Sequence, residues 1–160
     1  MENPLSLRLI KEEQESSEKL LELLVSSTHS PKGRFSQEDS YIMKKKNDAD
    51  MLAAIVRASN RYAMRPALVI DDRTYTYQEL FGLAGSICET LRNLKEDIIG
   101  ITAENRMETY ASILAVLLSG KTYVMLHPDY PAERNCRIAR QSGIGLLLYS
   151  GENGDILPPD

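Results

Sequence analysis

The sequence predicts an α/β protein with a mainly parallel sheet and flanking helices, preceded by a helical extension. Short, continuous apolar runs occur near 98–101, 122–126 and 144–149, and each run has the length of one strand. Segments with apolar residues at helical spacing separate these runs. Continuous apolar strands that alternate with helices are typical of a parallel sheet covered on both faces.

The first 47 residues differ from the rest, because they are charged and rich in serine. We predict a charged helical extension and linker over 1–47. A helix over about 6–25 would have apolar residues mainly at its two ends, so it would pack only there or dock on a partner. Proline and glycine predict a loop over 26–35. A short helix after Ser36 would end in Lys44–Lys46, which complement a helix C-terminus.

A helix followed by a hairpin opens the remaining chain. Apolar residues at helical spacing predict a helix over 48–60, with Asp48 as its cap. Extended segments at 67–70 and 73–76 are predicted to pair as strands, with Asp71 and Asp72 in the turn between them.

The next helix has a clear start signal. Thr76 and Glu79 have the spacing of a capping box, in which each side chain bonds the backbone amide of the other. Gly82 and Gly85 weaken the helix by up to about 1 kcal/mol each, and we expect them to allow close packing on a neighbour. The apolar stripe of this helix comprises Leu80, Leu83, Ile87, Leu91 and Leu94.

A third helix, over 107–119, is apolar nearly all round and is expected to be buried on more than one side. Asn105 and Glu108 repeat the capping spacing at its start. Gly120 fits its C-terminal cap, because glycine enters the left-handed conformation freely.

The last helix begins near Pro131, which suits a first turn, and ends at Gly143. Residues 151–160 are predicted to be an exit linker, because they have no apolar pattern that would complete a domain. The predicted α/β subdomain therefore spans 48–150.

Composition limits the possible partners and the compartment. The net charge is −4, which does not favour nucleic acid or anionic lipid. Cys88 and Cys136 are far apart without a CxxC pattern, as expected of reduced thiols. The start lacks the pattern of a signal peptide, and the apolar window 111–118 is far below the roughly 20 residues that cross a bilayer. We expect a cytoplasmic protein with no membrane or nucleic-acid partner.

Two stretches are more specific than a generic α/β pattern. The first is TYTYQEL at 74–80, and the second is LSGKTYV at 118–124, continued by PDYPAER at 128–134. Together they resemble the first two conserved blocks of the adenylate-forming (AMP-forming) superfamily, which includes acyl-CoA synthetases, luciferases and the adenylation domains of non-ribosomal peptide synthetases. The Pro-x-Tyr-Pro-x-x-Arg ending is most similar to the amino-acid-activating branch. The resemblance covers about 48–150 and implies a partial N-terminal domain of such a ligase.

The sequence departs from the family pattern at His127, where Asp is usual, at Met125, where Pro is usual, and around Ser119. Helix capping and strand burial explain both blocks, so we interpret them as structural. His127 follows the carboxyl end of a strand, where α/β proteins often bind ligands, but we interpret it as a loop residue because no catalytic partner is evident. Arg134 and Asp129 are expected to form a local ion pair.

The resemblance implies a reaction in which a carboxylate attacks the α-phosphate of ATP–Mg, pyrophosphate leaves, and a thiol captures the acyl-AMP. The family holds ATP with a Ser/Thr/Gly-rich loop ending in Pro-Lys-Gly, with Tyr-Gly-x-Thr-Glu and Thr-Gly-Asp blocks, and with a C-terminal lysine. None of them occurs after the second block. SSTHSPKG at 26–33 lacks the glycines of the phosphate loop and precedes the first block, so it is interpreted as a linker. We predict no catalytic, cofactor-binding or metal-binding residue in this chain, with ATP and Mg acting in the full-length parent.

Two hypotheses follow. In the first, the chain is an N-terminal ligase fragment that serves only as a scaffold, its partner is the remainder of the ligase, and its exposed apolar surface allows self-association. In the second, it is a stand-alone interaction module that docks through 1–47. An independent enzyme is least supported, because we find no catalytic triad or metal cluster and Asp71-Asp72 suits a turn.

Overall fold

The structure is a computed structural model that describes residues 5–9, 48–150 and 157. Its main sheet consists of β1 (Leu5–Leu9), β4 (Ile98–Thr102), β5 (Thr122–Leu126) and β6 (Leu146–Ser150). The strand order is β1-β6-β4-β5, and β4 runs parallel to both β5 and β6. The predicted parallel sheet is therefore confirmed, with an antiparallel strand at one edge.

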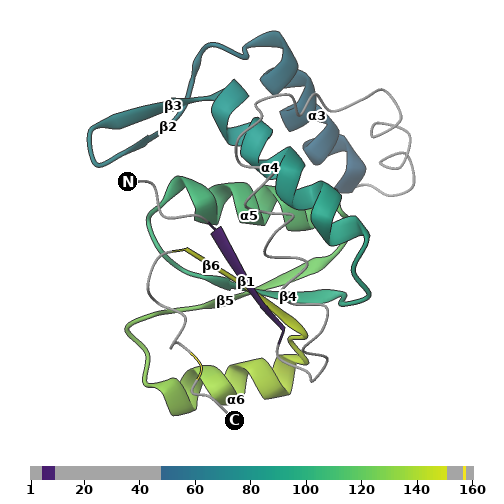
Figure 1. The fold of residues 1–160 in the computed structure, drawn as a ribbon. Coiled ribbons are helices and arrows are strands. Elements are labelled where there is room, and N and C mark those ends of the chain that lie inside the picture. Colours follow the sequence, from purple (N-terminus) through teal and green to yellow (C-terminus); the bar gives the residue numbers. More distant parts are fainter. Residues whose placement is uncertain (1–4, 10–47, 151–156, 158–160) are drawn as a thin grey trace.

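Helices cover both faces of this sheet (Figure 1). On one face lies α5 (Met107–Leu118), followed outward by α4 (Tyr77–Arg92) and α3 (Asp48–Arg61). On the other face lies α6 (Ala132–Ser142). Each face has its own apolar cluster: Ile99, Ile101, Leu146 and Leu148 pack towards α5, whereas Leu126, Ala139, Ile144 and Leu147 pack on the α6 side. No helix in the described ranges is long and apolar enough to cross a membrane.

The predicted helix over about 6–25 is wrong at its start, because residues 5–9 form strand β1. This strand pairs antiparallel with β6, so that Leu5 lies opposite Ser150 and Leu9 opposite Leu146. The sequence Leu-Ser-Leu-Arg-Leu alternates with period two, which suits a strand, and the backbone at the outer edge of β6 supplies its partner. The predicted remainder of that helix, the loop and the short helix before residue 47 lie outside the described residues.

The predicted hairpin is confirmed as β2 (Pro66–Ile70) and β3 (Arg73–Thr76), which form a separate two-stranded sheet. Its turn places both central residues in the left-handed region, with φ of 46° at Asp71 and 65° at Asp72. Two left-handed residues match the twist of hairpin strands, and aspartate tolerates this conformation better than most residues do. The hairpin projects beside α4 in Figure 1.

The capping box at the start of α4 is also confirmed. The Thr76 amide donates to Glu79 Oε2 at 2.7 Å, and the Glu79 amide donates to Thr76 Oγ1 at 3.2 Å. The bonds from the Thr76 backbone and hydroxyl stabilise the carboxylate, so they hold the pKa of Glu79 below its usual value. Leu80, Ile87 and Leu91 of the predicted stripe are buried.

The second predicted capping box does not form. Arg106 stands at the N-cap of α5 without a side-chain bond, so Asn105 is one position too early to cap the helix. Asn105 Oδ1 accepts a hydrogen bond from the Tyr110 hydroxyl at 3.0 Å instead.

Glycine positions give mixed outcomes. Gly120 and Gly143 follow their helices with φ of 74° and 71°, which confirms both predicted caps. Gly82, in contrast, has open space where a Cβ would lie, so close packing does not explain it.

The tail, predicted to be a linker over 151–160, is described only at Leu157. That side chain is buried in the α6-side cluster. The predicted boundaries of the extension, the subdomain and the linker stay predictions.

Candidate functional site at the carboxyl edge of the sheet

The carboxyl ends of β4 and β5 mark a topological switch point. The chain leaves β4 towards α5 on one face and leaves β5 towards α6 on the opposite face (Figure 1). In open α/β sheets the crevice between two such ends is the usual place for ligands. The segments that border it here are 102–106 and 127–131.

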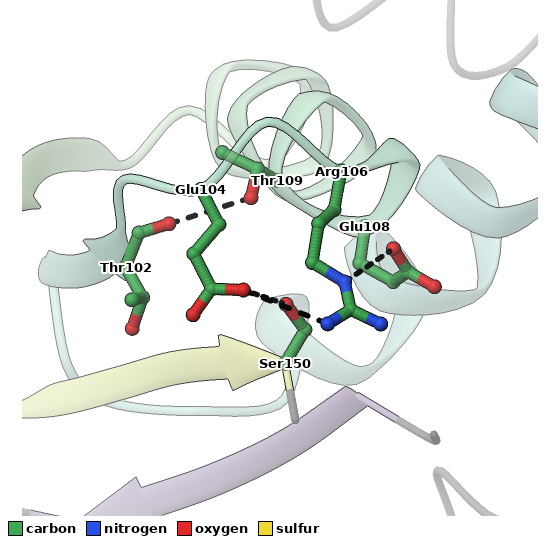
Figure 2. Close-up of polar contacts among 6 residues, drawn as sticks. All are labelled: Thr102, Glu104, Arg106, Glu108, Thr109 and Ser150. Atoms are coloured by element: carbon green, nitrogen blue, oxygen red, sulfur yellow. Dashed lines mark hydrogen bonds and ion pairs between the residues drawn. The ribbon is translucent and has the colours of Figure 1, made fainter. Parts of the chain in front are cut away.

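On the α5 side, polar side chains form a connected cluster (Figure 2). The Arg106 guanidinium lies 3.8 Å from Glu104 Oε2 and 3.8 Å from Glu108 Oε2. The buried Ser150 hydroxyl, at the end of β6, donates to Glu104 Oε2 at 3.4 Å. The cluster thus links the loop after β4 to the end of β6. A separate hydrogen bond joins the first turn of α5 to the end of β4, because the Thr109 hydroxyl donates to the carbonyl oxygen of Thr102 at 3.4 Å.

The charged groups of this cluster pair with one another. The Arg106 guanidinium has two carboxylates within 3.8 Å, so this cation is already paired within the chain. Within the described residues there is no group of three or more acidic, histidine or cysteine side chains that would hold a metal ion. The arrangement suits a positioning role for the loop.

The loop after β5 holds His127 in a local network. The Asp129 amide donates to His127 Nδ1 at 3.3 Å. The Asp129 carboxylate lies 3.6 Å from the same atom, and the imidazole stacks on Tyr130 with 5.2 Å between ring centroids. Asn135, at the start of α6, donates from Nδ2 to the His127 carbonyl oxygen at 2.9 Å.

Two expectations about this loop change. His127 does have an aspartate beside it, two residues along the chain. The expected Asp129–Arg134 ion pair is replaced by other contacts, because the Arg134 guanidinium lies 3.8 Å from the centroid of the Tyr130 ring. The side chains of His127 and Asp129 are 43% and 86% exposed, so the pair lacks the desolvation that strengthens catalytic dyads.

The Glu104–Arg106–Glu108 cluster is the feature that sequence reasoning missed. Its signal was present, since these residues follow directly after an apolar strand. The Ser150 partner was not foreseeable without the pairing of β6 with β4. The phosphate-loop-like stretch 26–33 and the lysines 44–46 lie outside the described residues.

Comparison with known proteins gives a consistent picture. Residues 55–158 match the profile of the family described as AMP-binding enzyme. Bacitracin synthase 2 of Bacillus licheniformis is 40% identical over 86 residues, which cover 52% of this chain and 3% of that protein. Tyrocidine synthase 3 of Brevibacillus parabrevis is 32% identical over 104 residues, which cover 63% of this chain and 2% of that protein. The chain therefore spans only a few per cent of the length of these relatives.

Solved structures agree on the fold. The N-terminal subdomain of Klebsiella oxytoca NpsA matches with a TM-score of 0.51 and 28% identity over 59% of this chain and 25% of that chain. IdnL7 matches with a TM-score of 0.54 and 28% identity over 57% of this chain and 19% of that one. The non-ribosomal peptide synthetase FmoA3 has a TM-score of 0.64 over 78% of this chain and 15% of that chain, and at 24% identity it supports the fold alone.

Proposed function

This chain belongs to the AMP-binding enzyme family, and from that premise we propose that it is the N-terminal part of an ATP-dependent, AMP-forming ligase. Such a ligase joins a carboxylate to AMP with release of pyrophosphate, and then passes the acyl group to a thiol. The observation that carries the proposal is the family match over 55–158, which contains both conserved blocks. The similarity to peptide synthases supports an amino acid as the carboxylate.

Within that ligase, the chain is proposed to act as a scaffold and not as a catalyst. The family's ATP-holding motifs do not follow the second block in the 160 residues. The charged groups at the carboxyl edge pair with one another, since Arg106 lies 3.8 Å from both Glu104 and Glu108. ATP and Mg would then be held by other residues of the parent.

The proposed partner is the remainder of the ligase. Large hydrophobic side chains are exposed on α3, the hairpin, α5, β5 and the loops, namely Met51, Tyr62, Met64, Val69, Tyr110, Tyr123 and Tyr130. Within the described residues β5 pairs with β4 alone, which leaves it an edge strand. These surfaces suit contact with further protein, and they would favour self-association of the isolated chain.

A cytoplasmic location is proposed as well. Neither Cys88 nor Cys136 forms a disulfide, and Cys88 is buried. Cysteines that stay reduced are typical of proteins in reducing compartments.

ATP–pyrophosphate exchange tests the proposal. The 160-residue chain alone should show exchange at background level with any amino acid, and the parent that contains it should exchange with at least one. Exchange by the chain alone would contradict the scaffold role. A parent that activates no carboxylate would contradict the ligase assignment itself.

The alternative, a stand-alone interaction module that docks through 1–47, makes an opposite prediction. In the structure, residues 5–9 are part of the sheet, so this portion of the extension already has an internal partner. A monomer that unfolds cooperatively and does not bind a hydrophobic dye would favour the module.

A further inference from the structure

Two buried polar atoms at the carboxyl edge have no hydrogen-bond partner among the described residues. They are Thr102 Oγ1, at the end of β4, and Asn135 Oδ1, in the first turn of α6. Thr102 is 2% exposed and Asn135 is fully buried. Buried polar atoms in proteins are nearly always hydrogen-bonded, either to protein or to an ordered water molecule.

Both side chains lie on the α6 side of the sheet. A Cβ on Gly100 would lie 3.0 Å from the Leu147 side chain, which belongs to the α6-side cluster. Because side chains alternate along a strand, Thr102 faces the same side as position 100. Asn135 precedes Ala139 by one helical turn, and Ala139 packs in that same cluster.

Both side chains also lie at the same end of the sheet. Thr102 is the direct strand partner of Leu126. The next residue, His127, accepts the Asn135 Nδ2 bond at its carbonyl oxygen at 2.9 Å. The Asn135 amide is therefore held one residue beyond the strand partner of Thr102.

The same bond sets the orientation of the amide. If the Asn135 amide were flipped, its oxygen would face the His127 carbonyl oxygen, and neither atom could donate. Asn135 Oδ1 is thus an acceptor, whereas the Thr102 hydroxyl can both donate and accept.

We propose that a buried water molecule bridges Thr102 Oγ1 and Asn135 Oδ1 at the switch point between β4 and β5. Water has both donors and acceptors, and buried waters are bound by two to four polar groups of this kind. The water bridge joins the end of β4 to the first turn of α6. Because Asn135 also bonds the His127 carbonyl oxygen, the bridge helps to fix the position of the loop after β5. Its role is positional, and it does not depend on the ligase assignment.

Replacing Thr102 by valine tests the bridge, because valine keeps the shape and removes the hydroxyl. In the 160-residue chain, Thr102→Val should raise the unfolding equilibrium constant roughly tenfold, since Asn135 Oδ1 and the water lose a partner. Thr102→Ser keeps the hydroxyl and should retain the water.

Ser112→Ala is the matched control. Ser112 Oγ on α5 is also buried and has no hydrogen-bond partner among the described residues, but its neighbours form the apolar α5-side cluster. This control should leave the constant unchanged or lower it.

A direct observation of the water completes the test. Water–protein magnetization transfer in NMR should reveal a long-lived water next to the Thr102 methyl group and the Asn135 side-chain amide of the wild-type chain, and it should be lost in Thr102→Val. A Thr102→Val chain as stable as the wild type would overturn the proposal. A destabilised variant without any long-lived water in the wild type would also overturn it, because the loss of stability would then have another cause.

Discussion

At the scale of single residues, local hydrogen bonds account for the start of α4. Thr76 and Glu79 satisfy each other's backbone amides, which would otherwise lack partners at a helix N-terminus. The pair lies next to the hairpin, so it also sets where the hairpin ends and the helix begins.

We expect Thr76→Ala to lower the free energy of unfolding by about 1 kcal/mol, because the helix loses its N-cap. The pH dependence gives a second signature. The pKa of Glu79 is lower in the folded state, so its contribution is present above the unfolded pKa and is lost as pH falls through the folded pKa. Urea titrations at several acidic pH values should show this loss in the wild type and a smaller one in Thr76→Ala. An equal loss of stability at acidic pH in both chains would contradict a role for the hydrogen bond from the Thr76 hydroxyl to Glu79.

Two glycines should respond in opposite ways to alanine. Gly82→Ala should raise the free energy of unfolding by up to about 1 kcal/mol, because the helix gains propensity and the new methyl group meets open space. Gly100→Ala should lower it by about 1–3 kcal/mol, because its Cβ would lie 3.0 Å from Leu147 and 3.1 Å from Ile144. Thermal or urea unfolding of both variants provides the measurement, and the same sign in both would contradict this account.

At the scale of elements, Lys121 joins two connections that are distant in sequence. Its ammonium group, on a side chain 9% exposed, donates to the carbonyl oxygens of Leu94 at 3.0 Å and Glu96 at 2.9 Å. It thus ties the α4–β4 connection to the residue before β5. Asp97 Oδ1 lies 3.8 Å from the ammonium nitrogen, but the Asp97 side chain is 90% exposed. The two hydrogen bonds to carbonyl oxygens therefore contribute most of the stabilisation that Lys121 provides.

We expect Lys121→Met to lower the free energy of unfolding by about 1–3 kcal/mol, because the two carbonyl oxygens lose their charged donor. The exposed Lys95, in the same connection, is the control, and Lys95→Met should change the value by less than about 0.5 kcal/mol. Chemical denaturation of both variants measures the difference. Similar effects in the two would show that general charge, and not the buried bonds, is responsible.

Strand β1 should protect the outer edge of β6. Deleting residues 1–9 should increase hydrogen exchange at the β6 amides, because the pairing between Leu5–Leu9 and Leu146–Ser150 is lost. Deleting 1–4 is the control and should leave exchange in β6 unchanged. Unaltered protection of β6 after the longer deletion would contradict the strand pairing.

At the scale of the whole molecule, the two edge strands of the sheet differ in direction and in position along the chain. At one edge β1 runs antiparallel beside β6, whereas at the other β5 pairs with β4 alone within the described residues. Tyr123 on β5 and Tyr110 on α5 are among the exposed side chains. The surface that suits a further protein therefore includes this second edge.

The isolated chain should bind a hydrophobic dye and form concentration-dependent oligomers. Tyr123→Lys should reduce both, since a charge on an edge strand opposes pairing with another chain. The exposed Asn60→Lys in α3 is the charge-matched control and should have little effect. Sedimentation velocity over a range of concentrations checks the prediction, and a strictly monomeric wild type would refute it.

Most of the helices and strands in the described residues were predictable from local sequence. The hairpin, the capping box at Thr76, the two glycine caps and the three parallel strands all depend on residues close together in the chain. Two predictions were wrong, namely the helix over about 6–25 and the cap at Asn105. The predicted helix over about 6–25 overlapped strand β1 because the partner of that strand, β6, lies about 140 residues away. The Asn105 cap failed because α5 begins one residue later than the pattern suggested.

The sequence by itself determined the family, the α/β class and the order of the elements, because capping, turn formation and apolar periodicity act over a few residues. Only the tertiary structure decided which polar groups meet. It brought Ser150 to Glu104, Lys121 to the carbonyls of Leu94 and Glu96, and the Asn135 amide to the end of β5. The physical reason is that strand order and crossover direction set these distances, and both arise from packing the whole sheet between its helices.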